Sequence, residues 1–212
     1  MRTILQLNTS LFGSGGQSSR LADAFVTVFR AQHPAVRLIV RDLAADPVPH
    51  LTAERFQSFL AKPEKRTGAQ RAVVDHSDAL IDELQRADTI VLGLPMYNFG
   101  VPSTLKAYFD HVARAGVTFK YTDKGPVGLL TGKKAIVFAA RGGLYAGTPM
   151  DTQTSYVRDF LRFLGIGDVE FVYAEGLAMG EEAKAGSLAK AQLALTLLAA
   201  ESAVEFDDAV SV

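Results

Sequence analysis

The sequence predicts an α/β fold in which a five-stranded parallel sheet lies between two layers of helices, a three-layer sandwich. Five short apolar runs are typical of strands, and segments with helical periodicity separate them. Strands and helices that alternate in this way form a parallel sheet with helices on both faces. No linker or internal repeat divides the 212 residues, so we expect residues 1–212 to form a single domain.

The expected strands are short and apolar, and each is followed by polar or glycine-containing turns. They are 3–7, 36–40, 89–94, 134–140 and 169–174. The third of them is almost wholly apolar, which is typical of a strand buried on both faces. Residues 116–132 are rich in glycine and aromatic residues, and we expect an excursion or a hairpin there.

The expected helices show apolar residues at intervals of three and four positions. They are 18–29, 52–60, 69–85, 103–115, 151–164 and 181–204. A charged loop at 62–68 separates the second from the third. Ser103 is a suitable N-cap for the fourth, after Pro102 has fixed the entry of the chain.

Five strands in this alternation suit the order 2-1-3-4-5 of flavodoxin-like sheets. Ligands of open α/β sheets bind outside the carboxyl ends of the strands, where the strand order reverses. In this chain the loops at that point are 8–18, 95–102 and 140–147. We therefore expect one site built from three loops.

The first loop is rich in hydroxyl groups and glycine, and it precedes a helix. Such a loop can bind phosphate through amides, hydroxyls and the positive end of the helix; an ordinary loop with a serine N-cap is an equal alternative. Ser18 stands where a dinucleotide fingerprint needs its third glycine, and no Gly-Lys-Ser/Thr follows. A monophosphate fits better than a dinucleotide or a triphosphate.

The second loop contains Pro95, Met96, Tyr97, Asn98 and Phe99, directly after a buried strand. Amides and aromatic rings at a strand end can bind a flat ligand with a polar edge, such as a flavin ring. The alternative is that the aromatic residues plug the core, although Asn98 gains nothing there. In the third loop, Gly142 and Gly143 let the backbone approach a ligand, and a flexible turn with a solvated Arg141 is the alternative.

Composition excludes several classes of function. The formal net charge is −1, so we expect neither nucleic acid nor a membrane as partner. The chain has no cysteine, and its four histidines lack metal-ligand spacing, so we predict no metal site. The N-terminus does not read as a signal peptide and no apolar run is long enough for a membrane span, so we expect a cytoplasmic protein.

Taken together, these motifs resemble the FMN-dependent NADH-azoreductases, flavodoxin-fold enzymes also counted among quinone reductases. The resemblance covers nearly the whole chain, and its marks lie at 41–47, 95–99, 113–119, 132–135 and 141–143. Only the Met-Tyr-Asn-Phe run is specific by itself. Two positions depart from the family pattern, because Gly16 and Ala140 stand where serine is common.

The resemblance implies FMN as a tightly bound cofactor. It implies that the phosphate is held by Ser10, Gly16, Gln17 and Ser18, the ring by Pro95, Met96, Tyr97, Asn98 and Phe99, and the pyrimidine edge by Ala140, Arg141, Gly142 and Gly143. It further implies a homodimer, with Tyr121 or Phe163 as aromatic lids from the second subunit; for each residue, a core or hairpin role is the alternative.

The implied reaction is a two-electron, ping-pong reduction of quinones and azo compounds by NADH or NADPH, in which FMN is reduced first. We expect Asn98 to contact the N5/O4 edge of the flavin, and the amides of Gly142 and Gly143 to stabilise negative charge near N1 and O2. A flavodoxin-type electron carrier or a flavin-binding regulator is the main alternative. Near-balanced charge and the additional lengths at 62–68 and 116–132 favour the enzyme over it. A Rossmann dehydrogenase without flavin is the other contender.

Overall fold

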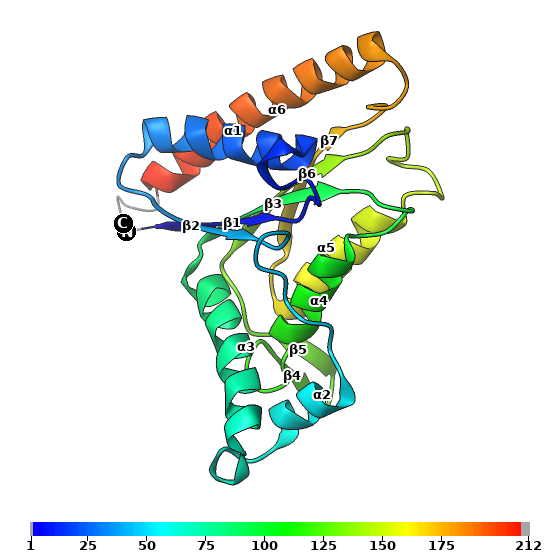
Figure 1. Cartoon of the computed structure of the whole chain (residues 1–212). Helices are drawn as coiled ribbons and strands as arrows, with labels where there is room; N and C mark the ends of the chain where they lie inside the picture. Colours follow the sequence, from blue (N-terminus) through cyan, green and yellow to red (C-terminus); the bar gives the residue numbers. More distant parts are fainter. Residues whose placement is uncertain (1, 209–212) are drawn as a thin grey trace.

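The computed structural model describes residues 2–208, with side chains up to residue 201. Its centre is a five-stranded parallel sheet with the order β2-β1-β3-β6-β7 (Figure 1). The strands are β1 Thr3–Asn8, β2 Arg37–Asp42, β3 Thr89–Pro95, β6 Lys134–Ala140 and β7 Asp168–Ala174. The predicted order 2-1-3-4-5 is confirmed, because β4 Phe119–Thr122 and β5 Gly125–Gly128 form a separate antiparallel hairpin.

Helices cover both faces of the sheet, which confirms the three layers. One face carries α1 Gln17–Gln32 and α6 Glu181–Asp208, and the other carries α3 Gly68–Arg86, α4 Ser103–Val112 and α5 Thr152–Leu164 (Figure 1). Two apolar cores lie between the layers, one on each face of the sheet, and side chains of β3 alternate between them. Val91 packs in the core under α1 and α6, whereas Ile90 and Leu92 pack in the core formed with α3, α4 and α5. This alternation explains why β3 is apolar at nearly every position.

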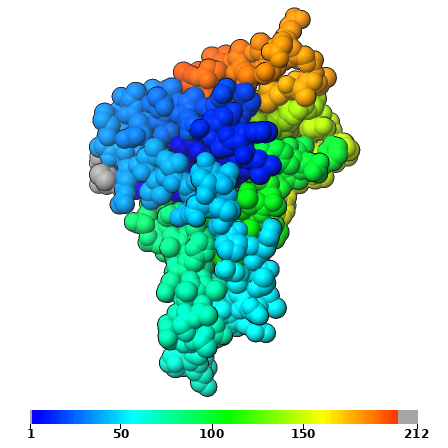
Figure 2. Space-filling model, viewed as in Figure 1, coloured from blue at the N-terminus to red at the C-terminus, as the bar shows by residue number. Residues whose placement is uncertain are grey.

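Helix α2, Ala53–Leu60, packs against α3 below the sheet. In Figure 2 this cyan part of the chain stands out from the body as a protrusion. The loop predicted at 62–68 contains the short 3-10 helix η2 Pro63–Lys65 and leads into the capping box of Thr67 and Gln70 at the start of α3. The reciprocal hydrogen bonds of that box fix where α3 begins.

The prediction for the start and end of α4 is wrong in two respects. Pro102, and not Ser103, is the N-cap residue, and no side chain caps the helix. The extended backbone of Pro102 places Ser103 one position inside the helix, where its hydroxyl is not an N-cap. The helix ends at Val112 and not at 115, because the Thr118 hydroxyl donates to the Val112 carbonyl at 2.6 Å and turns the chain away.

Candidate functional site

The loops at 8–18, 95–102 and 140–147 meet at the carboxyl edge of the sheet, as predicted. Tyr97 joins the first to the second, because its hydroxyl accepts a hydrogen bond from the Leu11 amide at 3.2 Å and lies 3.5 Å from the Ser10 hydroxyl. The Met96 amide donates to the Ala140 carbonyl at 3.0 Å, which joins the second to the third. The three loops therefore form one connected surface.

The first loop leads into the N-terminus of α1 through the 3-10 helix η1, Gly13–Gly15. Gly16 is the N-cap residue and makes no side-chain cap, so the serine N-cap considered as an alternative is wrong. The hydroxyls of Ser18 and Ser19 are buried and have no hydrogen-bond partner among the described residues. Orphan hydroxyls at the positive end of a helix are suited to an anion.

Gly16 departs from the serine expected at this position for a steric reason. A Cβ at Gly16 would lie 2.1 Å from the Ser10 hydroxyl oxygen and 2.5 Å from the Ser10 Cβ. Ser10 is itself fixed, because its hydroxyl accepts the Phe12 amide at 3.2 Å. Ser10 therefore takes the space that a side chain at position 16 would need.

The second loop contains a tight turn with an unusual backbone. Tyr97 and Gly100 exchange two backbone hydrogen bonds of 3.0 and 3.2 Å, and between them Asn98 and Phe99 have φ values of 49° and 64°. Two successive positive φ angles define a type I′ turn, which asparagine tolerates and phenylalanine disfavours by about 1 kcal/mol. The Phe99 side chain is 45 % exposed, so it does not plug the core.

The third loop uses its carbonyl groups for structure. Those of Arg141, Gly142 and Gly143 accept hydrogen bonds from the backbone amides of residues 176–178 at 2.9–3.1 Å. The amides of Gly142 and Gly143 take no part in these bonds. In the part of the chain that the structure describes, neither N–H group has a hydrogen-bond acceptor, so both are left as donors.

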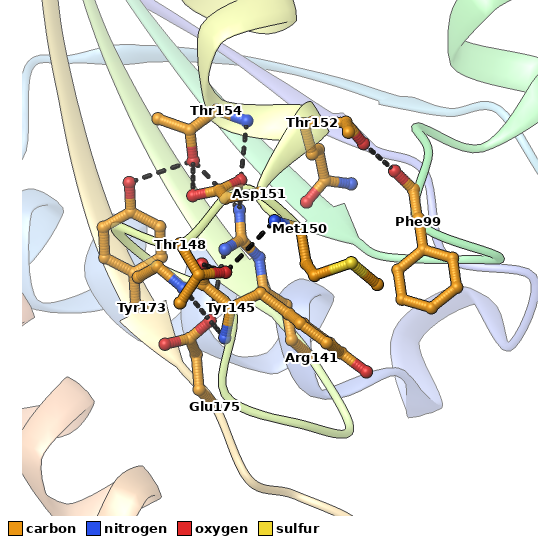
Figure 3. Close-up of polar contacts among 12 residues, drawn as sticks. Phe99, Arg141, Tyr145, Thr148, Met150, Asp151, Thr152, Thr154, Tyr173 and Glu175 are labelled. Atoms are coloured by element: carbon orange, nitrogen blue, oxygen red, sulfur yellow. Dashed lines mark hydrogen bonds and ion pairs between the residues drawn. The ribbon is translucent and has the colours of Figure 1, made fainter.

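The side chain of Arg141 lies inside the protein, so the alternative of a solvated arginine is wrong. Its guanidinium group forms ion pairs with Asp151 at 2.8 Å and Glu175 at 3.2 Å, and donates to the Thr154 hydroxyl at 2.9 Å (Figure 3). It also stacks near the Tyr173 ring, 5.0 Å from the centroid. The whole residue is 1 % exposed, and its backbone amide donates to the Ala174 carbonyl at 2.9 Å, so Arg141 supports the third loop from inside the protein.

Two carboxylates balance this buried cation and shape the loop. Burial acts to raise the pKa of Asp151, but hydrogen bonds from Arg141 and Thr154 outweigh burial and lower it below the ordinary value. Glu175 also accepts the amides of Tyr145 and Ala146, both at 2.9 Å. Removing one member of such a buried group typically costs about 3–5 kcal/mol, because the remaining charge is left unpaired.

Tyr121 and Phe163 lie away from the three loops within this chain. Phe163 is near the end of α5, roughly 16 Å along the helix from Thr152, given a rise of about 1.5 Å per residue. It packs on Phe119 of the hairpin, with 4.4 Å between ring centroids, while Tyr121 is 73 % exposed. An exposed tyrosine on a hairpin is free to contact another molecule.

Sequence reasoning missed the residues that hold the loops in place. Gln153, Thr154 and Glu175 carry no motif, and Asp151 was expected only as the start of a helix. Within the described residues, no group of three or more His, Asp or Glu side chains is placed to hold a metal ion, and no helix could span a membrane.

The sheet order and the three loops at its carboxyl edge define a flavodoxin-like protein, and the family model described as a flavodoxin-like fold matches residues 2–197. An FMN-dependent NADH:quinone oxidoreductase of Cellvibrio japonicus is 55 % identical, over 91 % of this chain and 97 % of the relative. One of Alcanivorax borkumensis is 54 % identical, over 89 % and 96 %. The chain belongs to the flavodoxin-like family and, within it, to the group that contains these FMN-dependent NADH:quinone oxidoreductases.

Solved structures agree with this assignment, and the family expected from the motifs is confirmed. An azoreductase from Bacillus anthracis str. Sterne superimposes with a TM-score of 0.86 at 26 % identity, covering 94 % of this chain and 99 % of the other. An FMN-dependent NADH-azoreductase from Bacillus anthracis str. Ames Ancestor, in complex with FMN, gives a TM-score of 0.83 at 26 % identity, covering 94 % and 100 %.

Proposed function

We propose that this chain is an FMN-dependent oxidoreductase that uses NADH to reduce quinones and azo compounds. The names of its curated relatives and structural neighbours support this reaction. The observation that carries the proposal is the meeting of three loops at one sheet edge, with orphan serine hydroxyls at one end and unused amides of Gly142 and Gly143 at the other. This arrangement fits a ligand with a phosphate and a flat polar ring.

The first loop would hold the phosphate of FMN through Ser10, Gly16, Gln17 and Ser18. The N-terminus of α1 supplies amides and a partial positive charge, and the buried Ser18 hydroxyl lacks any other partner in the described part of the chain. A single phosphate needs no lysine or metal ion for its charge to be accommodated there. This loop gives the cofactor its position and takes no part in electron transfer.

The other two loops would hold the ring. Pro95, Met96, Tyr97, Asn98 and Phe99 would line one side of it, and Ala140, Arg141, Gly142 and Gly143 would meet its pyrimidine edge. Arg141 would support this edge from inside the protein, since its guanidinium group is buried and its amide and carbonyl are hydrogen-bonded to Ala174 and Leu177. Asn98 is exposed at the tip of the turn, where its carboxamide can reach the polar N5/O4 edge.

When bound, FMN supplies the redox chemistry, taking two electrons from NADH and passing them to a quinone or azo acceptor in ping-pong fashion. The protein's part is electrostatic and steric. The N–H groups of Gly142 and Gly143 would donate hydrogen bonds to the edge where negative charge develops, and the bonds that their carbonyls accept from Ala178 and Gly176 hold this segment in place beforehand. No side chain of the three loops is assigned as acid or base, and we propose that water supplies the protons.

We further propose that the enzyme works as a cytoplasmic homodimer, in which Tyr121 or Phe163 of each chain covers the site of the other. The exposed apolar residues of the hairpin region support this: Tyr121 is 73 %, Val127 43 % and Leu129 38 % exposed. Gel filtration should give a mass near twice the 22.8 kDa of one chain. A mass near that of a single chain would contradict the shared site.

One experiment tests the activity against the electron-carrier alternative, which the relatives do not favour. The FMN-loaded protein is mixed with NADH without oxygen, and then with a quinone or an azo dye. Rapid bleaching of the yellow colour by NADH and its recovery with the acceptor are expected. A loaded protein that NADH does not bleach would contradict the proposal, and the same assay with NADPH measures the preference between the two nicotinamides.

A further inference from the structure

The first turn of α5 contacts the second loop, 95–102, and the third loop, 140–147, which flank the proposed ring site. Its N-cap residue and its first three residues are all polar, at the point where the chain leaves the third loop; they are Asp151, Thr152, Gln153 and Thr154. The side chain of Asp151 accepts the Thr154 amide at 3.0 Å, which fixes the start of the helix. The four side chains therefore project from a well-defined place.

Two of the four bind the second loop. The Thr152 hydroxyl donates to the Phe99 carbonyl, and Gln153 Nε2 donates to the carbonyls of Pro95 at 2.8 Å and Gly100 at 3.2 Å. The Pro95 carbonyl lies two residues before the turn that carries Asn98, the Phe99 carbonyl lies within it and the Gly100 carbonyl lies at its end. The unfavourable φ angle of Phe99 persists because these bonds hold the turn on several sides.

The other two bind the third loop. Asp151 and Thr154 both accept hydrogen bonds from the guanidinium group of Arg141, at 2.8 and 2.9 Å (Figure 3). Residues three apart on a helix share a face, whereas the two between them point in other directions. One helical turn thus reaches the second loop with Thr152 and Gln153, and the third loop with Asp151 and Thr154.

Gln153 is the most informative of the four. It is 0 % exposed, its Nε2 atom is engaged by the second loop, and its Oε1 atom has no hydrogen-bond partner among the described residues. Burying a primary amide is unfavourable unless its hydrogen bonds compensate. The two bonds from Nε2 to the turn are the compensation present in this structure.

We propose that the first turn of α5 sets the separation of the two loops, and that Gln153 is a positioning residue for the flavin ring. This inference rests on the proposed function, which names the ligand. It assigns to Gln153 no contact with the cofactor or the substrate. Its effect passes through the carbonyls of Pro95 and Gly100, and hence through the placement of Asn98 between them.

The test compares Gln153→Leu with Ser77→Ala. Leucine removes both donors at similar volume. Ser77 is also 0 % exposed and donates to the His111 carbonyl at 2.6 Å, but it lies between α3 and α4, away from the loops. Both variants should melt below the wild-type temperature. Binding of FMN and of riboflavin to the full-length, flavin-free chain is then followed by quenching of flavin fluorescence.

For Gln153→Leu, we expect the Kd to rise about tenfold for FMN and by a similar factor for riboflavin. The first loop is untouched, whereas the buried Pro95 carbonyl loses the Gln153 donor and the Gly100 carbonyl keeps only the Tyr97 amide. Ser77→Ala should bind both ligands as the wild type does. An unchanged Kd in Gln153→Leu would overturn the inference, as would an equal rise in Ser77→Ala.

A second variant covers the case in which Gln153→Leu does not fold. Thr152 is exposed, so Thr152→Val removes its bond to the Phe99 carbonyl with little effect on the melting temperature. We expect a rise of about threefold in the Kd of both flavins, as for one lost hydrogen bond. No rise would overturn the inference. A wild-type chain that binds neither flavin would instead contradict the proposed function itself.

Discussion

The hydroxyl of Tyr97 accepts a hydrogen bond from the backbone amide of Leu11 across 86 residues of sequence, so the second loop holds the first loop, which is the proposed phosphate site. Tyr97→Phe should therefore weaken the phosphate end more than the ring end. We expect the Kd of FMN to rise about threefold, as for one partly exposed hydrogen bond, with the Kd of riboflavin unchanged. Titration of both ligands checks this, and equal losses for the two would contradict it.

Gly16 has no room for a side chain, whereas its neighbour Gly15 does. A Cβ at Gly15 would come no closer than 4.0 Å to another residue, compared with 2.1 Å from the Ser10 hydroxyl at Gly16. Gly16→Ala should lower the free energy of unfolding by about 1–3 kcal/mol, as overpacking does, and should weaken FMN binding. Gly15→Ala is the matched control. Equal free energies of unfolding in urea for the two variants would contradict this prediction, since they would show that the Ser10 side chain can move without cost.

The turn at Asn98 allows its side chain to be removed without changing the backbone. Glycine accepts the φ of 49° without strain, whereas alanine would add a backbone penalty of about 1 kcal/mol. Asn98→Gly should therefore leave the free energy of unfolding within about 0.5 kcal/mol and slow the reduction of bound FMN by NADH about tenfold. Stopped-flow absorbance measures that rate. Unchanged FMN affinity together with an unchanged rate would remove Asn98 from the proposed role.

The free energy of unfolding should decrease as the pH is lowered below about 6.5, because the folded protein disfavours protonation of His111. Burial lowers the pKa of His111 below the ordinary 6.5, with Arg55 and His76 acting in the same direction and the hydrogen bond to the Ala107 carbonyl opposing them. The unfolded chain then binds a proton more readily than the folded one, so the free energy of unfolding decreases as the pH falls below about 6.5. Asp110 on the same helix raises the pKa only as a minor effect.

Urea unfolding at pH 7.5 and pH 5.5 measures this dependence. His111→Gln should show a smaller decrease between the two pH values than the wild type. The exposed His50, changed to Gln, serves as the control and should keep the wild-type dependence. An identical pH dependence in all three proteins would assign the acid sensitivity to other groups.

The sheet was predictable mainly because its central strands β3 and β6 are almost wholly apolar. Ile90, Val91 and Leu92 face two cores in turn, and no other element explains such a run. The first and last residues of α4 were not predictable. The place of Ser103 depends on the backbone angles of Pro102, and the end of the helix depends on the hydrogen bond from the Thr118 hydroxyl to the Val112 carbonyl.

The three loops of the site were also predictable, because Tyr97, Asn98 and the glycines at 142 and 143 are unusual at strand ends. The residues that hold these loops in place were not predictable from the sequence. Gln153 and Glu175 are ordinary residues in a helix and after a strand, and their roles arise only from contacts 58 and 34 residues away. The same holds for Arg141, whose sequence context gives no sign that its side chain turns inward to two carboxylates.

The hydrogen bonds from residues 176–178 to the carbonyls of Arg141, Gly142 and Gly143 also set an order of events during synthesis. The first loop, 8–18, and the turn at Asn98 leave the ribosome long before β7 does. The third loop, 140–147, takes its shape only after the segment that follows β7 has emerged and β7 has joined the edge of the sheet. The nascent chain therefore completes the proposed site only after about five sixths of its residues have been synthesised.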